Sequence, residues 1–190
     1  FPEKRPFFLE GADIFDDQLG AVYTRTVGDP LWGVKLTGRE GRHTVGAFVA
    51  RDEVTNLLIP GEEGSYVTSL DMETTASAVR YRLDLGRSSG VGMLATSREG
   101  DDYHNRTAGL DGFLRFAKSE RLDFQILGSW TQYPDSTAIA FGQPMGETSD
   151  VGLDAVYSHR SENVHWYVHH RYIGVDFRSD LGFRPHVGDR

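Results

Sequence analysis

Charged side chains alternate with apolar neighbours along several candidate strands, and this pattern has the most chemical potential in the chain. Successive side chains of a strand point to opposite sides of its sheet, so the charges gather on one surface. A dry core would not accept them without partners. A hydrated lumen is the simplest interpretation, and a ladder of opposite charges that selects charged or sugar solutes is the sharper one. The predicted lumen-facing residues are Arg80, Arg82, Asp84, Asp111, Arg115 and Asp123.

Two long predicted loops, residues 52–75 and 132–147, combine aromatic side chains with carboxylates. Aromatic faces can stack on sugar rings, carboxylates accept hydrogen bonds from hydroxyl groups, and loops on a rigid scaffold carry recognition. We expect the two loops to emerge at the same rim and to hold any ligand-binding surface; two acidic loops without a ligand are the alternative. The candidate ligand-binding residues are Tyr66, Tyr133, Phe141, Glu62, Glu63 and Asp135.

Neighbouring carboxylates raise the hypothesis of glycoside hydrolysis, which needs two such groups about 5 to 9.5 Å apart. The pairs in this chain lie in predicted loops, where acidic groups are usually solvated. We therefore assign no catalytic residue and disfavour an enzyme, with a glycoside hydrolase-like activity as the weakest of the alternatives. The pairs are Asp16–Asp17, Glu62–Glu63 and Asp101–Asp102.

Histidines near the carboxyl end suggest a metal site, but their spacing argues against one. His165 and His169 share a strand face four residues apart, which is roughly 13 Å at about 3.3 Å per residue. Zinc bonds to nitrogen are near 2 Å, and His170 points the other way. We predict neither a metal nor a cofactor.

The composition indicates an all-β chain rather than a disordered one. Of 190 residues, 38% are hydrophobic and 12% aromatic, and 22 are glycine; this is typical of alternating strands. The net charge of −8 excludes nucleic acid as a probable class of partner, because binding it needs a concentrated basic patch. The absence of cysteine removes disulfides and thiolate chemistry.

An antiparallel up-and-down meander is the predicted architecture, centred on the hairpin of residues 107–131. Its arms have about 10 residues, enough for a tilted strand to cross a bilayer. We expect one domain over residues 1–190, with an irregular lead-in at 1–20 and an irregular tail at 173–190. The nine candidate strands are 21–27, 31–37, 43–51, 76–85, 91–98, 107–117, 121–131, 151–159 and 164–172.

Connection lengths favour part of a transmembrane β-barrel, because short and longer connections alternate as they do in outer-membrane barrels. The short ones are 38–42, 86–90, 118–120 and 160–163, and the longer ones are 52–75, 99–105 and 132–147. A closed single-chain barrel needs an even strand number, so nine strands predict an open edge. The residues expected on the apolar exterior are Leu110, Leu114, Phe116, Phe124, Ile126, Trp130, Leu153, Tyr157, Val164 and Trp166.

Four stretches resemble an uncharacterised outer-membrane β-barrel family of Gram-negative bacteria, domain of unknown function 5916. They are Phe1–Phe15 (FPEKRPFFLEGADIF), Lys35–Arg39, Met93–Glu99 and Asp180–Phe183. The resemblance implies a partial barrel in the cell outer membrane, in contact with lipid, with further strands outside this sequence. It also implies an amino-terminal carbohydrate-binding family 9-like domain, and it supplies no catalytic residues.

The resulting hypothesis is an outer-membrane barrel segment with surface binding or transport linked to carbohydrate. The alternative is a soluble β-barrel that binds a small ligand or a carbohydrate in a polar cavity. Exterior positions separate the two, because a lipid-facing sheet places Leu110 outside and Asp111 inside, and a soluble one does the reverse.

Overall fold

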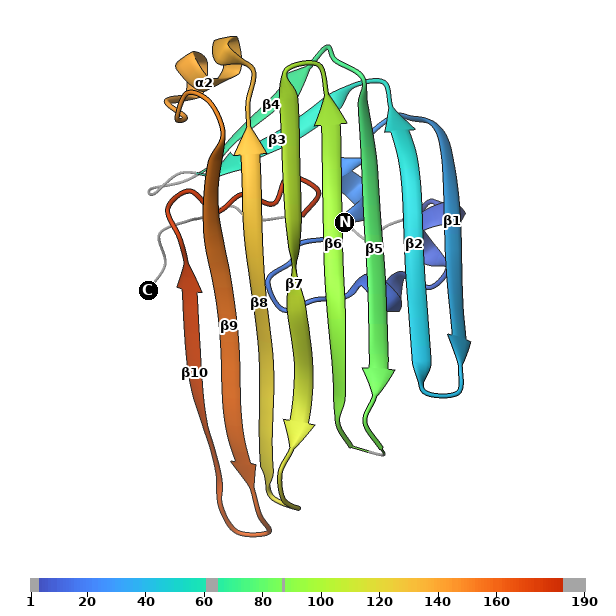
Figure 1. Ribbon diagram of the computed structural model, residues 1–190, viewed down its shortest axis with the longest axis vertical. Helices are drawn as coiled ribbons and strands as arrows, with labels where there is room; N and C mark the ends of the chain where they lie inside the picture. The colour runs from blue at the N-terminus through green and yellow to red at the C-terminus, as the bar shows by residue number, and fades with distance from the viewer. Residues whose placement is uncertain (1–3, 61–64, 87, 183–190) are drawn as a thin grey trace.

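The computed structural model describes residues 4–60, 65–86 and 88–182. Its main element is an antiparallel sheet with the strand order β1-β2-β5-β6-β7-β8-β9-β10, so that strands adjacent in the sheet follow one another along the chain (Figure 1). The all-β, up-and-down fold class is therefore confirmed. The strands of this sheet are β1 (Pro30–Glu40), β2 (His43–Asp52), β5 (Thr74–Asp84), β6 (Gly90–Gly100), β7 (Tyr103–Arg115), β8 (Glu120–Gln132), β9 (Thr148–Arg160) and β10 (His165–Ile173).

A hairpin interrupts this order between β2 and β5. Its strands, β3 (Thr55–Pro60) and β4 (Ser65–Leu70), pair with each other and form a separate sheet. Thr55 also makes a single antiparallel bridge with Val27. The remaining elements are short: α1 (Pro6–Leu9), η1 (Ala12–Phe15), η2 (Thr24–Thr26) and α2 (Asp135–Phe141).

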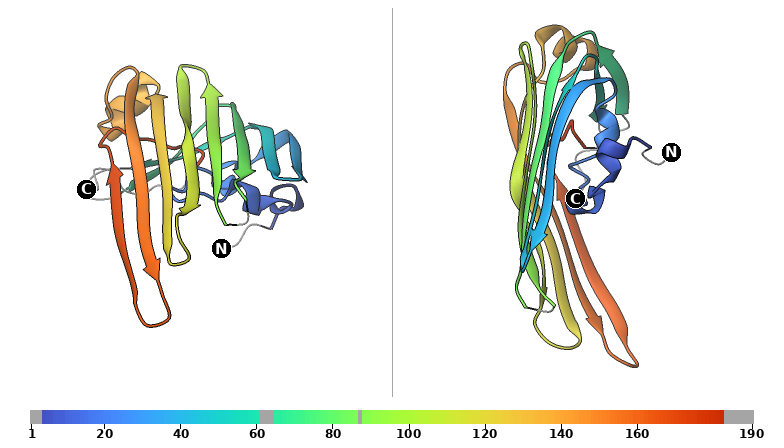
Figure 2. Two further views of the ribbon diagram at one scale, coloured as in Figure 1. Left: turned by 60° about the horizontal axis from the view of Figure 1, so that its bottom comes forward. Right: turned by 90° about the vertical axis from the view of Figure 1, so that its right-hand side faces the viewer.

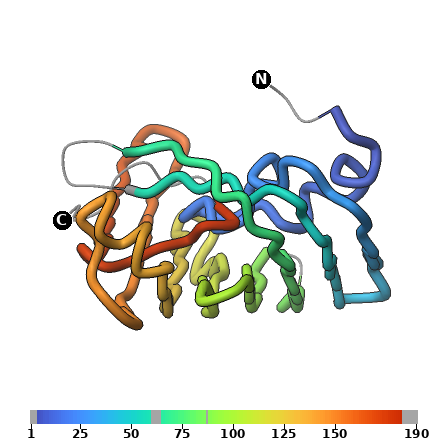
Figure 3. Tube along the Cα trace, turned by 90° about the horizontal axis from the view of Figure 1, so that it is seen from above, coloured from blue at the N-terminus to red at the C-terminus, as the bar shows by residue number. Residues whose placement is uncertain are grey.

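The sheet is an open trough. Among the described residues β1 and β10 form its two edges and do not pair with each other, and the view along the strands shows that the sheet is curved (Figure 3). Residues 4–27 and 174–182 lie on its concave side (Figure 2). We call the face that they cover the inner face and the opposite one the outer face. The open edge predicted from the sequence is present.

Aromatic packing explains why the amino-terminal segment lies on the inner face. Phe8 and Phe15 make edge-to-face contacts with Phe48 of β2, with ring centroids 5.9 and 5.4 Å apart. All three side chains are buried. Phe177, from the carboxyl-terminal segment, belongs to a second buried cluster with Leu94 and Leu127 of the sheet.

One predicted strand, residues 21–27, is wrong. The segment contains η2 and crosses the inner face, where Tyr23 N–H donates to the Leu181 carbonyl at 2.8 Å. The Arg5 guanidinium donates a hydrogen bond to the Val27 carbonyl at 2.6 Å. These contacts, to residues distant in the chain, satisfy the backbone in place of a sheet partner, which a period-two pattern of seven residues does not reveal.

The predicted loops also need correction. Residues 52–75 contain β3 and β4, and residues 132–147 contain α2. The connection predicted at 99–105 is a two-residue turn at 101–102, with Asp102 in the left-handed region at φ 53°. Asp is among the few residue types that tolerate this conformation, so the strands extend further than the acidic composition suggested.

Candidate functional site

The charged residues predicted to face a lumen all belong to the inner face. Arg80 lies beside Asp111 in a two-pronged ion pair, with Nη2 2.5 Å from Oδ2, and its side chain is 1% exposed. Such fork-to-carboxylate pairs are the strong kind of charge-assisted hydrogen bond. The buried Arg80 Nε and Gln125 Nε2 atoms have no hydrogen-bond partner among the described residues.

The lead-in adds a carboxylate to this cluster. Asp17 accepts the Ala21 N–H at 2.8 Å, and the neighbouring Leu19 N–H donates to Gln125 Oε1 at 2.7 Å. Burial raises the pKa of Asp17, while the hydrogen bond from Ala21 and the charge of Arg80 oppose that rise. Asp17 thus holds the turn of its own segment, and the Leu19 N–H ties that turn to Gln125 of the sheet.

An inner pocket of about 290 Å³ opens beside this cluster. It brings together Arg82, Asp111 and Asp123, three of the predicted lumen-facing residues, and adds Asp16 and Asp17 from the lead-in. The arrangement is rich in carboxylates and suits a hydroxylated or cationic solute. The predicted residue Asp84 is half-buried near the end of β5 and does not line it.

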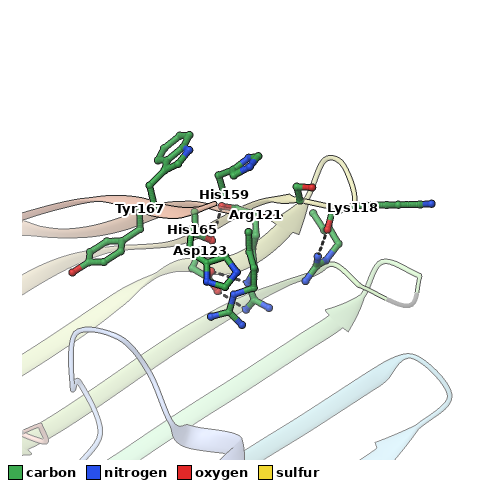
Figure 4. A pocket seen from close by; sticks show the side chains of 11 residues that line it. Lys118, Arg121, Asp123, His159, His165 and Tyr167 are labelled. Carbon is green, nitrogen blue, oxygen red and sulfur yellow. Dashed lines mark hydrogen bonds and ion pairs between the residues drawn. The ribbon is translucent and has the colours of Figure 1, made fainter. Parts of the chain in front are cut away.

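A second inner pocket, of about 520 Å³, lies at the ends of β7 to β10 near the short turns (Figure 4). It contains Arg115 and Asp123 of the predicted set. Sequence reasoning missed the rest of its cationic lining, because Lys118 and Arg160 read as turn residues. The signal available was the same alternation that identified Asp123, since Arg121 precedes it by two residues on the same face.

Buried polar networks hold the covering segments in the trough. Arg98 of β6 is fully buried, and it donates to Asp52 Oδ2 at 3.2 Å and to the Asn56 carbonyl at 2.8 Å. Asp52 also accepts the backbone N–H groups of Gly28 and Asp29, at 3.0 and 2.7 Å. The buried ion pair between Arg98 and Asp52 therefore links the main sheet to the β3–β4 hairpin and to the backbone at residues 28–29.

A second network ties down the carboxyl-terminal segment. Asp180 accepts the hydroxyl protons of Tyr103 and Tyr133, at 2.7 and 3.0 Å, and its N–H donates to Asn105 Oδ1 at 2.8 Å. Burial raises the pKa of Asp180, and the two hydroxyl groups oppose the rise. Burial and then the charge of Asp180 raise the pKa of Tyr133 well above its ordinary value.

The upper rim, at the end of the trough where α2 and the β3–β4 hairpin lie, holds the predicted ligand-binding loops (Figure 1). Tyr66 and Phe141 meet there, with ring centroids 5.8 Å apart, and Tyr66 is 59% exposed. The two loops do emerge together. Asp135 is exposed at the start of α2, and Glu62 and Glu63 lie outside the described residues.

Tyr133 does not offer an aromatic face to a ligand as predicted. Its side chain is 5% exposed and stacks on Tyr103, with ring centroids 5.9 Å apart. Its hydroxyl belongs to the Asp180 network. Its position at the end of a strand, rather than within the loop, buries it against the covering segments.

His169 and His170 lie on opposite faces of β10, as their adjacent positions predicted. His169 Nε2 lies 3.0 Å from Asp154 Oδ2 on the inner face, and His170 pairs across the sheet with Ala155 on the outer face. Within the described residues no group of three or more metal-binding side chains lies together.

The outer face carries a continuous apolar band. Leu110 is 56% exposed on this face and Asp111 lies on the inner one, the arrangement predicted for a lipid-facing sheet. Each of the eight strands contributes to the band. Its large exposed members, 38 to 67% accessible, are Val34, Leu36, Val45, Val49, Val79, Met93, Leu110, Phe116, Ile126, Trp130, Val151, Val164, Trp166 and Val168.

Comparisons of the chain with protein-family models, with curated proteins and with solved structures returned no match. The resemblance to the outer-membrane family therefore stays a prediction. Among the described residues no helix is long and apolar enough to cross a membrane.

Proposed function

We propose that the chain is a segment of an outer-membrane β-barrel, with its outer face against lipid and its inner face filled by its own terminal segments. The apolar band on the outer face carries this proposal. Soluble monomers rarely expose contiguous apolar patches larger than a few hundred Å², and this band crosses all eight strands of the sheet. A bilayer covers such a surface at no cost.

Strand dimensions support the same proposal. Strands β5 to β10 have between 9 and 13 residues, and a tilted strand needs about 9 to 11 to cross a membrane. Along β7 and the residue that follows it, the band runs from Ala108 to Phe116, eight steps that span about 26 Å at about 3.3 Å each. The lipid-facing band of outer-membrane barrels is about 25 Å tall.

The inner face fits the interior of such a barrel. Arg80 and Arg98 are buried there with carboxylate partners, and polar residues at lumen positions are the rule in these proteins. The alternative, a soluble barrel with a polar cavity, leaves the exposed outer band unexplained.

Carbohydrate-linked surface binding or transport is the role we propose for this scaffold. The contact at the upper rim between the exposed Tyr66 and the half-buried Phe141, with the carboxylate of Asp135 exposed on α2, supports it. Aromatic faces and hydroxyl acceptors are the groups that saccharides need. Outer-membrane lipid and carbohydrate are thus the proposed partners.

The membrane assignment is tested by purifying residues 1–190 with and without detergent. We expect a monodisperse preparation only with detergent, and a change of gel mobility between unheated and heated samples. A monodisperse detergent-free preparation would remove the assignment.

The carbohydrate role is tested with the double variant Tyr66→Ala, Phe141→Ala, titrated with envelope and plant polysaccharides. We expect weaker binding than in the parent chain. The matched control is Tyr23→Ala, which removes a partly exposed tyrosine from the lead-in. Unchanged affinity, or no binding by the parent, would contradict a sugar contact at the upper rim.

A further inference from the structure

The larger inner pocket concentrates positive charge in an acidic chain. Four cationic side chains line it, those of Arg115, Lys118, Arg121 and Arg160, against the single carboxylate of Asp123. The whole chain has 20 Lys and Arg residues and 28 Asp and Glu residues. The net charge of the pocket lining is therefore positive, whereas that of the whole chain is negative.

Three of these four cations have no carboxylate partner among the described residues. Arg121 is paired with Asp123, its Nε lying 2.7 Å from Oδ2, and Arg115 donates to the Lys118 carbonyl at 2.8 Å. Within the described part of the chain no carboxylate pairs with the side chains of Lys118 or Arg160. A concave site lined by one sign of charge raises the local concentration of ions of the opposite sign.

The pocket also holds groups suited to a ring-shaped ligand. Tyr167 of β10 is 72% exposed, and it lies with Arg121, Asp123 and His165 on one side of the strands, whereas His159 lies on the other (Figure 4). The Arg121 guanidinium is fixed over the Phe113 ring, 4.7 Å from its centroid. An aromatic face beside guanidinium forks provides stacking for a ring and two-pronged binding for a carboxylate.

We propose that this pocket binds an acidic saccharide, a sugar ring that carries a carboxylate. The carboxylate lies against Arg160, and the ring lies on Tyr167. This inference deepens the proposed carbohydrate-linked role and rests on it, because it names the class of sugar and adds a site for it inside the trough, separate from the one at the upper rim.

The test is calorimetric titration of residues 1–190, in detergent micelles, with a trimer of galacturonate and with the neutral trimer of galactose. We expect the acidic trimer to bind and the neutral one to bind at least about tenfold more weakly, since one charge-assisted hydrogen bond accounts for about that factor. Higher salt should weaken the acidic trimer. Equal binding of both trimers, or of neither, would overturn the proposal.

Two variants locate the site. Arg160→Gln should lower the affinity for the acidic trimer about tenfold. Tyr167→Ala should also lower this affinity, because it removes the stacking face. Arg42→Gln is the matched control, because Arg42 is exposed in the β1–β2 turn at the same end of the sheet and its loss changes the net charge equally. An equal effect of Arg42→Gln and Arg160→Gln would overturn the pocket assignment.

Inorganic phosphate separates a saccharide site from a general anion site. We expect phosphate not to displace the acidic trimer at equal concentration, and displacement would overturn the saccharide assignment. A chain that requires detergent and binds no acidic trimer would refute this inference alone. A chain that is monodisperse without detergent would refute the membrane assignment instead.

Discussion

The inner and outer faces of the sheet, built from alternate residues of the same strands, reverse the usual relation between polarity and burial. On the inner face Arg80 and Arg98 are 1% and 0% exposed, and each has a carboxylate partner. On the outer face Leu110 and Val168 are 56% and 61% exposed. The inner face therefore makes its contacts with the chain itself, whereas the outer face is open to its surroundings.

The largest expected effect is on the inner face. Arg98→Ala leaves Asp52 buried without its partner, and breaking a buried pair in this way costs about 3 to 5 kcal/mol. Urea unfolding in detergent micelles measures the loss. The matched change is Arg106→Ala on the neighbouring strand, where an exposed pair with Glu99 contributes about 1 kcal/mol or less. Equal losses in the free energy of unfolding at the two positions would contradict the difference between the buried and the exposed ion pair.

A charge on the outer face comes next. If that face contacts lipid, Leu110→Arg should cost about 2 to 4 kcal/mol near the bilayer midplane, measured by unfolding in lipid vesicles. Leu110→Ser is a control that removes the apolar group without adding charge. In a soluble sheet an exposed Leu110→Arg is nearly neutral, and that result would exclude the membrane assignment.

A single hydroxyl group tests how the inner face holds its covering segment. Tyr133→Phe removes a hydrogen bond to Asp180, and bonds to charged groups contribute about 1.5 to 3 kcal/mol. The control is Tyr66→Phe, at the exposed rim. A loss for Tyr66→Phe as large as for Tyr133→Phe, again by urea unfolding, would place the Asp180 network outside the structural core.

The smallest expected effect is a slope in the pH dependence of stability. Burial raises the folded-state pKa of Asp180 above its ordinary value of 3.8. Its contribution to the free energy of unfolding is complete below that ordinary value and is lost as the pH rises through the raised pKa. Asp180→Asn should flatten stability over this weakly acidic range. An unchanged slope would mean that Asp180 titrates normally.

Much of this architecture followed from the sequence alone. Eight of the nine predicted strands are present, and the two-residue period placed Leu110 and Asp111 on the correct faces, because alternation is a local property of extended backbone. The short turns and the shared rim of residues 52–75 and 132–147 followed for the same reason. Local chemistry was sufficient wherever a residue's neighbours in sequence determined its direction.

Long-range contacts decided the rest. Residues 21–27 have a sequence pattern that is typical of a strand. They nevertheless cross the trough, because their backbone groups are hydrogen-bonded to Arg5 and Leu181. The sequence pattern predicts that Tyr133 is an exposed aromatic residue of a loop. Its side chain is instead buried, and its hydroxyl group binds the distant Asp180. The larger inner pocket exists because β7 to β10 bring Arg115 and Arg160 to one cavity, although the two residues are 45 positions apart in the numbering. Only the pairing of four strands decides such proximity, and no local pattern encodes it.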